Sequence, residues 1–123
     1  MSFVENITGA RVKDCVDSDP LLFIVHQNEM GKAIGKKAAN LRKVEEFLKR
    51  KVHFVEFSDD PAQFAMNYVQ PLRVNAHMED KIMFIEGNDT KTRGLVIGRD
   101  RKNLQQLKDV LNRFFDVAEI KVI

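Results

Sequence analysis

The chain has 123 residues, 44% of them hydrophobic and 31% charged, and this composition is typical of a folded globular protein rather than a disordered one. No apolar run approaches the roughly 20 residues that span a bilayer, and no basic stretch precedes an apolar one at the N-terminus, so we expect neither a membrane span nor a signal peptide. The single cysteine, Cys15, excludes an intrachain disulfide and favours a reducing, cytoplasmic setting. The net charge of +2 is a weak indication of nucleic-acid binding by itself, and its distribution along the chain is more informative.

The first half of the chain predicts two strands, a short helix, a longer helix and a final strand, at residues 11–15, 21–26, 28–34, 39–50 and 52–57. Asn28 is a plausible N-cap for the short helix, and a glycine-containing segment at 35–38 separates it from the longer one. Apolar residues recur at helical spacing from Leu41 to Leu48, with Phe47 among them, so this side of the longer helix is expected to face the core.

The second half opens with a helix that the first half lacks or has in shortened form. Asp60 is its expected N-cap, Pro61 suits the first helical position, Gln63 stands where a capping box needs it, and Pro71 ends the helix. Two strands, a short helix, a long helix and a last strand are then predicted, at residues 73–78, 81–86, 92–97, 102–115 and 117–122. The predicted fold class is therefore α+β.

Two basic segments reveal an internal repeat. Residues 32–51 hold eight basic residues against two acidic ones, and residues 91–108 hold six against one. A shift of 63 residues aligns AIGK at 33–36 with VIGR at 96–99, and Asn-Leu at 40–41 with Asn-Leu at 103–104. Because glycine, asparagine and the apolar positions recur in one order, we interpret the chain as two domains, residues 1–58 and 59–123, of one repeated unit.

Each unit places a glycine loop with basic residues between two predicted helices, GKKA at 35–38 and GRDR at 98–101. The second helix of each pair presents free backbone N–H groups and the positive end of its dipole at the loop. Glycine lets a phosphate approach the backbone closely, and Lys36, Lys37 and Arg99 can neutralise it. The loops are therefore predicted to hold a nucleic-acid backbone, with its bases lying over an apolar groove that includes Ala33 and Ile34.

This helix–loop–helix element resembles that of the KH domain, whose GXXG loop clamps about four nucleotides of single-stranded nucleic acid. The order of elements in the second unit matches the type II KH topology, α-β-β-α-α-β. The tandem resembles the archaeal NusA-like family of short transcription elongation and termination factors. The resemblance covers the chain from about Gly9 to Ile123 and is carried by the stretches GARVKDCVDSD, AIGKKAANLRKVEEFL, VEFSDDPAQFAMNYVQP and VIGRDRKNLQQLKDVL.

The resemblance implies a non-enzymatic protein that binds single-stranded RNA, with RNA polymerase or the transcription complex as a further candidate partner. It implies no cofactor, no metal and no catalytic residue. The residues expected to contact RNA lie in and beside the two loops: Gly31, Lys32, Ala33, Ile34, Gly35, Lys36, Lys37, Ala38, Asn40, Arg42, Lys43, Arg93, Gly94, Val96, Ile97, Gly98, Arg99, Arg101, Lys102 and Asn103.

The loops depart from the GXXG pattern at its fourth position, where Ala38 and Arg101 replace glycine. Asp100 also places a negative charge where a phosphate would pass, so the first loop is expected to bind RNA more strongly than the second. Two other interpretations stay open, namely a KH protein that docks on ribosomal RNA and a protein-interaction module whose loops no longer bind RNA. An enzyme is disfavoured, since no catalytic constellation is discernible.

Overall fold

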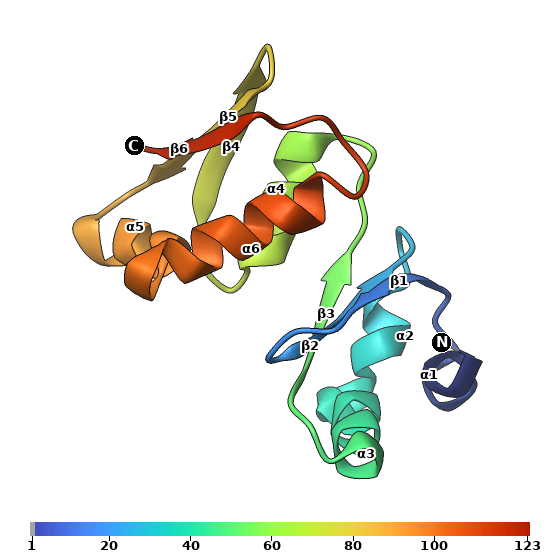
Figure 1. The fold of residues 1–123 in the computed structure, drawn as a ribbon. Coiled ribbons are helices and arrows are strands. Elements are labelled where there is room, and N and C mark those ends of the chain that lie inside the picture. The colour runs from blue at the N-terminus through green and yellow to red at the C-terminus, as the bar shows by residue number, and fades with distance from the viewer. Residues whose placement is uncertain (1) are drawn as a thin grey trace. The chain divides into compact units, whose positions relative to one another are not determined.

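A computed structural model describes residues 2–123, and after Ser58 the chain divides into two compact units. Each unit holds three α-helices, a one-turn 3₁₀ segment and three strands (Figure 1). The elements of the first unit are α1 (Ser2–Thr8), β1 (Val12–Val16), β2 (Leu21–Val25), α2 (Met30–Ile34), the 3₁₀ turn at Lys36–Ala38, α3 (Ala39–Leu48) and β3 (Val52–Glu56). Those of the second are α4 (Pro61–Val69), β4 (Val74–Glu79), β5 (Ile82–Gly87), α5 (Thr90–Ile97), the 3₁₀ turn at Arg99–Arg101, α6 (Lys102–Leu111) and β6 (Glu119–Val122).

The two sheets have the same topology. In the order β1-β2-β3 and β4-β5-β6, the first two strands are antiparallel and the third runs parallel to the second. A parallel neighbour needs a long crossover, and each unit supplies it as two consecutive helices joined by the glycine loop. The topology thus places each loop within the crossover, between two helices and away from the strands.

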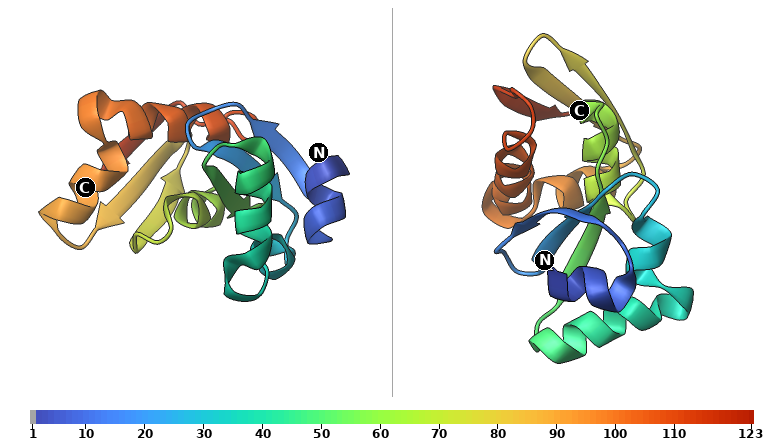
Figure 2. Two further views of the ribbon diagram at one scale, coloured as in Figure 1. Left: turned by 90° about the horizontal axis from the view of Figure 1, so that it is seen from below. Right: turned by 90° about the vertical axis from the view of Figure 1, so that its right-hand side faces the viewer.

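The core of the first unit lies between one face of its sheet and its three helices. Alternate strand residues such as Val12, Phe23 and Phe54 are buried there, as period-two alternation requires. They meet Val4 of α1, Ala33 of α2 and Val44 of α3, each at most 2% exposed. In Figure 2, α1 lies alongside α3, and the two helices contact each other.

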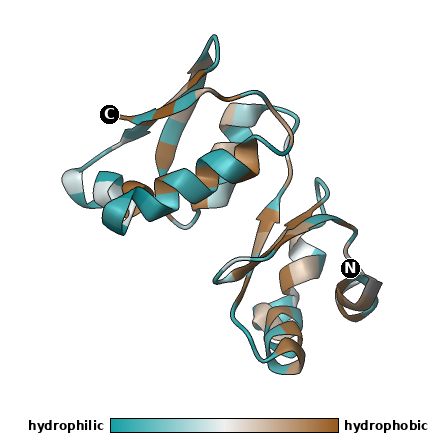
Figure 3. Cartoon of the chain, viewed as in Figure 1, coloured by the Kyte–Doolittle hydropathy of each residue, from teal (hydrophilic) through white to brown (hydrophobic). Residues whose placement is uncertain are grey.

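The core of the second unit is built in the same way. Its largest fully buried side chain is Phe64 of α4, whose ring lies 5.8 Å from that of Phe114 and 6.2 Å from that of Phe115. The apolar side of α6 contributes Leu104, Leu107, Val110 and Leu111, all at most 6% exposed. Figure 3 shows the alternating teal and brown segments along α6 that such a one-sided helix produces. The three phenylalanines therefore pack together inside the second unit.

The first helix of each unit begins and ends for identifiable reasons. Asp60 accepts a hydrogen bond from the backbone N–H of Ala62 at 3.1 Å, and Pro61 is the first residue of α4, as predicted. α1 has seven residues against nine in α4, so the first unit has this helix in shortened form. α1 ends at Thr8, and Gly9 after it has a φ of +75°, as does the left-handed residue that follows many helices.

Two predicted helix starts were wrong in detail. Asn28 does not cap α2, because it has a φ of +65° in a turn and the helix begins after Glu29. Gln63 does not complete a capping box, because its side-chain amide donates to Oδ1 of Asn67 at 2.9 Å instead of reaching back to the N-cap. In both places a local side-chain or turn preference competes with the capping pattern.

Several predicted ends shift by one to four residues. α3 ends at Leu48, because Lys49 takes a left-handed conformation with φ of +57°. α6 ends at Leu111, because the Asn112 side chain donates to the carbonyls of Lys108 and Val117 and accepts from the N–H of Val117. Phe47 was predicted to face the core, but it is 67% exposed.

Candidate nucleic-acid interface

The two glycine loops have almost the same backbone conformation. Gly35 has φ and ψ of +76° and +173°, and Gly98 has +76° and +171°. This region of backbone space is essentially open only to glycine. Each glycine closes the helix before it, since its N–H donates to the carbonyl of Gly31 at 2.9 Å in the first unit and of Gly94 at 2.8 Å in the second. The glycine therefore sets the sharp exit from the short helix into the loop.

The third and fourth loop residues are left-handed in both units. Lys37 and Ala38 have φ of +54° and +61°, and Asp100 and Arg101 have +55° and +63°. The two loops thus share one backbone conformation although Ala38 and Arg101 differ at the fourth position, and each left-handed non-glycine residue costs about 1–2 kcal/mol. The two loops therefore differ in the side chains that a ligand would meet, while their backbone paths agree.

An asparagine at the start of the second helix ties the two helices together. Nδ2 of Asn40 donates to the carbonyl of Lys32 at 2.8 Å, and Nδ2 of Asn103 donates to the carbonyl of Leu95 at 3.1 Å. A Cβ atom on Gly35 would lie 2.8 Å from Cγ of Asn40, and one on Gly98 would lie 2.6 Å from Cγ of Asn103. Glycine and asparagine recur together in the repeat because each asparagine occupies the space that its glycine leaves open.

The first loop is the more basic of the two. Lys36 and Lys37 are exposed immediately before α3, where the helix dipole adds positive potential. Nη1 of Arg42 donates to the carbonyl of Lys37 at 2.6 Å, so this guanidinium is held against the loop. Lys43 is exposed one residue further along α3.

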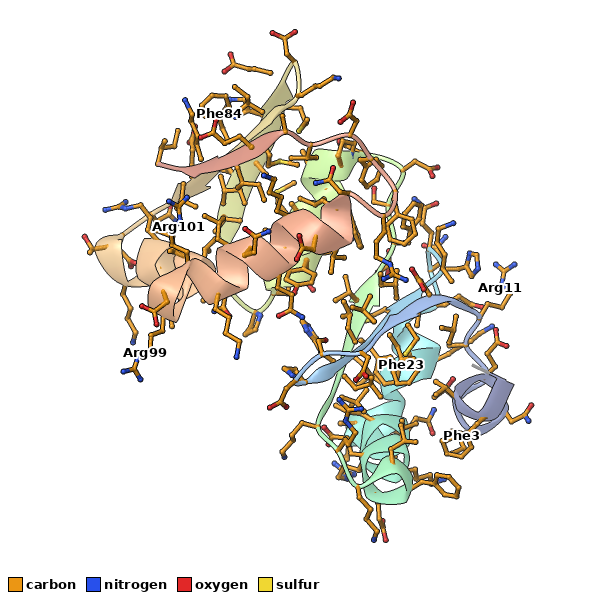
Figure 4. The ribbon with its side chains drawn as sticks, viewed as in Figure 1. Phe3, Arg11, Phe23, Phe84, Arg99 and Arg101 are labelled. Atoms are coloured by element: carbon orange, nitrogen blue, oxygen red, sulfur yellow. The ribbon has the colours of Figure 1, made fainter. Side chains whose placement is uncertain are left out.

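The second loop has a weaker positive charge. Arg99 and Arg101 flank Asp100, so residues 99–101 carry +1 (two basic, one acidic), whereas residues 36–38 carry +2 (two basic). Figure 4 shows Arg99 and Arg101 extending from the loop in different directions. Gln105, the repeat counterpart of Arg42, bonds to Asp109 at 3.0 Å, and Lys102 is exposed at the start of α6.

Two predicted RNA-binding bases have partners within their own unit. Nζ of Lys32 lies 3.2 Å from Oε2 of Glu29. The Arg93 guanidinium donates to the carbonyl of Gly87 at 2.9 Å and to the hydroxyl of Thr90 at 3.2 Å, so it ties the start of α5 to the end of β5. Both side chains therefore help to hold the short helix before the loop.

Glu29 is a buried acid that the sequence pattern did not reveal. Its Oε1 accepts hydrogen bonds from the backbone N–H and from Nε of Arg11, at 3.1 and 3.2 Å. The backbone hydrogen bond from Arg11, followed by the Lys32 ammonium, holds the pKa of this carboxyl below its ordinary value. The sequence gives no sign of this bond, because Arg11 is 18 residues away from Glu29.

The apolar residues beside the loops are only partly accessible. Ala33 and Val96 are 0% and 3% exposed, so their side chains lie in the core rather than on the surface. Ile34 and Ile97 are half-buried, and Gly31 and Gly94 are exposed on the short helices. The accessible apolar side chain next to the first loop is therefore Ile34, whereas α5 before the second loop presents both Ile97 and Leu95, the latter 48% exposed.

Other kinds of site find little support in residues 2–123. That part of the chain contains no group of three or more His, Cys, Asp or Glu side chains placed to hold a metal ion. Over the same residues, none of the helices combines the length and the apolar character that crossing a membrane requires.

Comparison with known proteins identifies the family. No family model matches the chain. It is 35% identical to the "Probable transcription termination protein NusA" of Methanocaldococcus jannaschii over all of this chain and 70% of that protein. It is 30% identical to the protein of the same name from Methanococcus vannielii, covering all of this chain and 74% of that one, and 31% identical to that of Halococcus morrhuae, covering 99% and 91%.

A solved structure shares the fold. The crystal structure of APE1850 matches 99% of this chain and 94% of its own with a TM-score of 0.77, at 24% sequence identity. The identities to the archaeal proteins, which cover 99% or more of this chain, confirm the predicted resemblance to an archaeal NusA-like factor. The chain belongs to the archaeal family of NusA-like transcription termination proteins.

Proposed function

We propose that the protein binds single-stranded RNA during transcription elongation or termination, through the loops at residues 35–38 and 98–101. The observation that carries this proposal is the shared backbone of the two loops, with a positive-φ glycine followed by two left-handed residues. Both loops end at the start of a ten-residue helix, where the positive end of the helix dipole favours a phosphate. The transcription role follows the family to which the chain belongs.

We further propose that the two units, residues 1–58 and 59–123, are type II KH domains. The support is their element order, α-β-β-α-α-β, together with a sheet whose third strand is parallel to the second. In KH domains the GXXG loop clamps the backbone of about four nucleotides. Two such units in one chain raise the effective concentration of each for an RNA strand that reaches both loops.

The first loop is the stronger clamp in this proposal. Lys36 and Lys37 offer two ammonium groups to phosphate, whereas Asp100 repels it between Arg99 and Arg101. The Arg42 guanidinium adds a third positive group that is already held at the first loop by the Lys37 carbonyl. Because phosphate contacts dominate the affinity for nucleic acid, the charge difference decides the ranking.

The test compares three double variants with the same change in charge. Lys36→Asp with Lys37→Asp alters the first loop, Arg99→Asp with Arg101→Asp alters the second, and Lys51→Asp with Lys121→Asp changes two exposed lysines outside both loops. Binding to labelled single-stranded RNA is measured by fluorescence anisotropy over a range of salt concentrations.

The first-loop variant should weaken binding at least several-fold and should flatten the salt dependence, whose slope is about −0.7 per phosphate neutralised on single strands. The second-loop variant should weaken RNA binding less than the first-loop variant, and the control variant should weaken it least. Equal effects of all three variants would show that only net charge matters and would refute the loop assignment. A larger effect at the second loop would reverse the ranking.

The alternative function for the same fold is that of a KH protein that docks on ribosomal RNA. Sedimentation of a cell extract distinguishes the two. A transcription factor should travel with RNA polymerase or nascent transcripts, and a ribosome-docking protein with ribosomal particles. The family name of the relatives favours the first outcome.

A further inference from the structure

An aromatic ring on α3 is left at the surface of the first unit. Phe47 is 67% exposed, the highest exposed fraction of any large hydrophobic residue described. It lies against Phe3 of α1, with ring centroids 4.2 Å apart and planes inclined by 34°. Figure 4 shows Phe3 at the side of α1 that faces α3. The repeat counterpart of Phe47 is Val110, which is 1% exposed, so the exposed ring is a feature of the first unit alone.

The ring lies on the same flank of α3 as groups beside the loop. Asn40, Lys43 and Phe47 are spaced by three and four residues, so they follow one side of the helix. Asn40 is anchored to Lys32 at the loop end, and Phe47 lies about 10 Å further along the helix axis. Lys43 is exposed between them. This flank therefore leads from the basic loop, past a lysine, to an aromatic pair.

The chemistry of the flank fits a nucleotide. Proteins that bind single strands combine positive groups that follow the phosphates with aromatic side chains on which bases stack. Lys36, Lys37 and Lys43 supply the positive groups, and Phe47 supplies a ring that is open on one side. The acidic Glu46 is adjacent in sequence but lies about 100° around the helix, so it does not separate Lys43 from Phe47. A single ring pair bordered by lysine offers too little apolar area for a stable protein partner.

We propose that Phe47, supported by Phe3, is a base-stacking platform for a nucleotide of single-stranded RNA that lies beyond the loop at residues 35–38. This inference rests on the proposed function, because the RNA must first be held at the loop. The platform lengthens the site of the first unit along α3 and makes its affinity depend on the length of the strand. The second unit, with Val110 in the core, has no equivalent extension.

The experiment measures binding of the full chain to two oligouridylates, one of about four nucleotides and one of about ten. Phe47→Ala removes the ring, and Phe47→Leu keeps an apolar contact with Phe3 while removing the flat face. Both variants should bind the longer oligomer about tenfold more weakly than the wild type, as expected for the loss of one stacked base. Their affinity for the shorter oligomer should be unchanged. Ile123→Ala, which alters another exposed apolar residue, should change neither affinity.

A fluorescent variant gives an independent readout. The chain contains no tryptophan, so Phe47→Trp introduces a single indole at the platform. Stacking of a base should quench its emission with the longer oligomer and leave it unchanged with the shorter one.

Four outcomes are informative. Length-dependent weakening together with length-dependent quenching supports the platform. Unchanged binding of both oligomers by Phe47→Ala refutes it while the proposed function stands. Equal weakening for both lengths also refutes it, since Phe47 would then act through the fold of the loop. If the wild type binds neither oligomer, the proposed function fails and the platform with it.

Discussion

Replacement of Gly35 by alanine should destabilise the first unit, and the structure sets the size of the effect. The backbone of Gly35, with φ of +76° and ψ of +173°, lies in the region that non-glycine residues occupy only at a cost of about 1–3 kcal/mol. The new Cβ would also meet Cγ and Nδ2 of Asn40 at 2.8 and 2.9 Å, so the bond from Asn40 to the Lys32 carbonyl must break. Loss of that bond adds about 0.5–1.5 kcal/mol. With both costs, Gly35→Ala should lower the free energy of unfolding by about 1.5–4.5 kcal/mol.

The chain offers a matched control for this change. Gly31 lies in α2, its added Cβ would meet nothing within 4 Å, and its φ is not positive. Gly31→Ala should therefore be neutral or stabilising by about 0.5–1 kcal/mol, because alanine is the better helix former. Urea unfolding followed by circular dichroism measures both variants under identical conditions.

A double variant separates the two causes. In Gly35→Ala with Asn40→Ala the clash with the Asn40 side chain is gone and its hydrogen bond cannot be lost twice. The combined destabilisation should therefore fall short of the sum of the single changes by about 1 kcal/mol. Full additivity would show that Gly35 and Asn40 act independently. Equal stability of Gly35→Ala and Gly31→Ala would refute the backbone argument altogether.

Three further predictions concern the fourth loop residues, Glu29 and Tyr68. Ala38→Gly and Arg101→Gly should leave the free energy of unfolding unchanged or raise it by up to about 1 kcal/mol in urea titrations, because relief of a left-handed residue offsets the entropy that glycine costs. The Glu29 carboxylate, whose pKa is lowered by the Arg11 backbone N–H, stabilises the folded state above its unfolded pKa and loses this contribution as pH falls through its folded pKa. The gap in unfolding free energy between the wild type and Glu29→Gln should accordingly narrow in acid, and a constant gap from neutral to acidic pH would contradict this. Burial raises the pKa of Tyr68 to about 12, and since it is the only tyrosine, alkaline absorbance titration should show a single phenol ionising near that value in the folded protein and at a lower pH in urea.

The repeat could be predicted from the sequence because both copies use the same residue types at the same loop positions. A glycine at the exit of the short helix and an asparagine five residues later recur since the asparagine side chain occupies the space beside a glycine without a Cβ. The buried face of α6 could be predicted because Leu104, Leu107 and Leu111 follow helical spacing, and all three are in the core.

Other features depend on residues that the chain brings together from a distance. The bond between Glu29 and the Arg11 backbone joins residues 18 positions apart, and no periodicity marks it. Phe47 follows the helical pattern that predicts a core position, yet α1 meets α3 through Phe3 at that point and leaves the Phe47 ring at the surface. The Arg93 guanidinium similarly donates a hydrogen bond to the Gly87 carbonyl at the end of β5, although its place in a basic segment predicted contact with RNA.

Residue types at short, regular spacing were enough to predict the two basic loops and the α+β composition of each unit, and four longer stretches of sequence pointed to the family. Folding, in contrast, selects the basic side chains that have partners within their own unit. Lys32 pairs with Glu29 although it is exposed, and Arg93 bonds to the end of β5, whereas Lys36 and Lys37 are exposed in the first loop. The physical reason is that a charge near buried or half-buried polar groups is drawn into hydrogen bonds with them, and only folding brings those partners within reach.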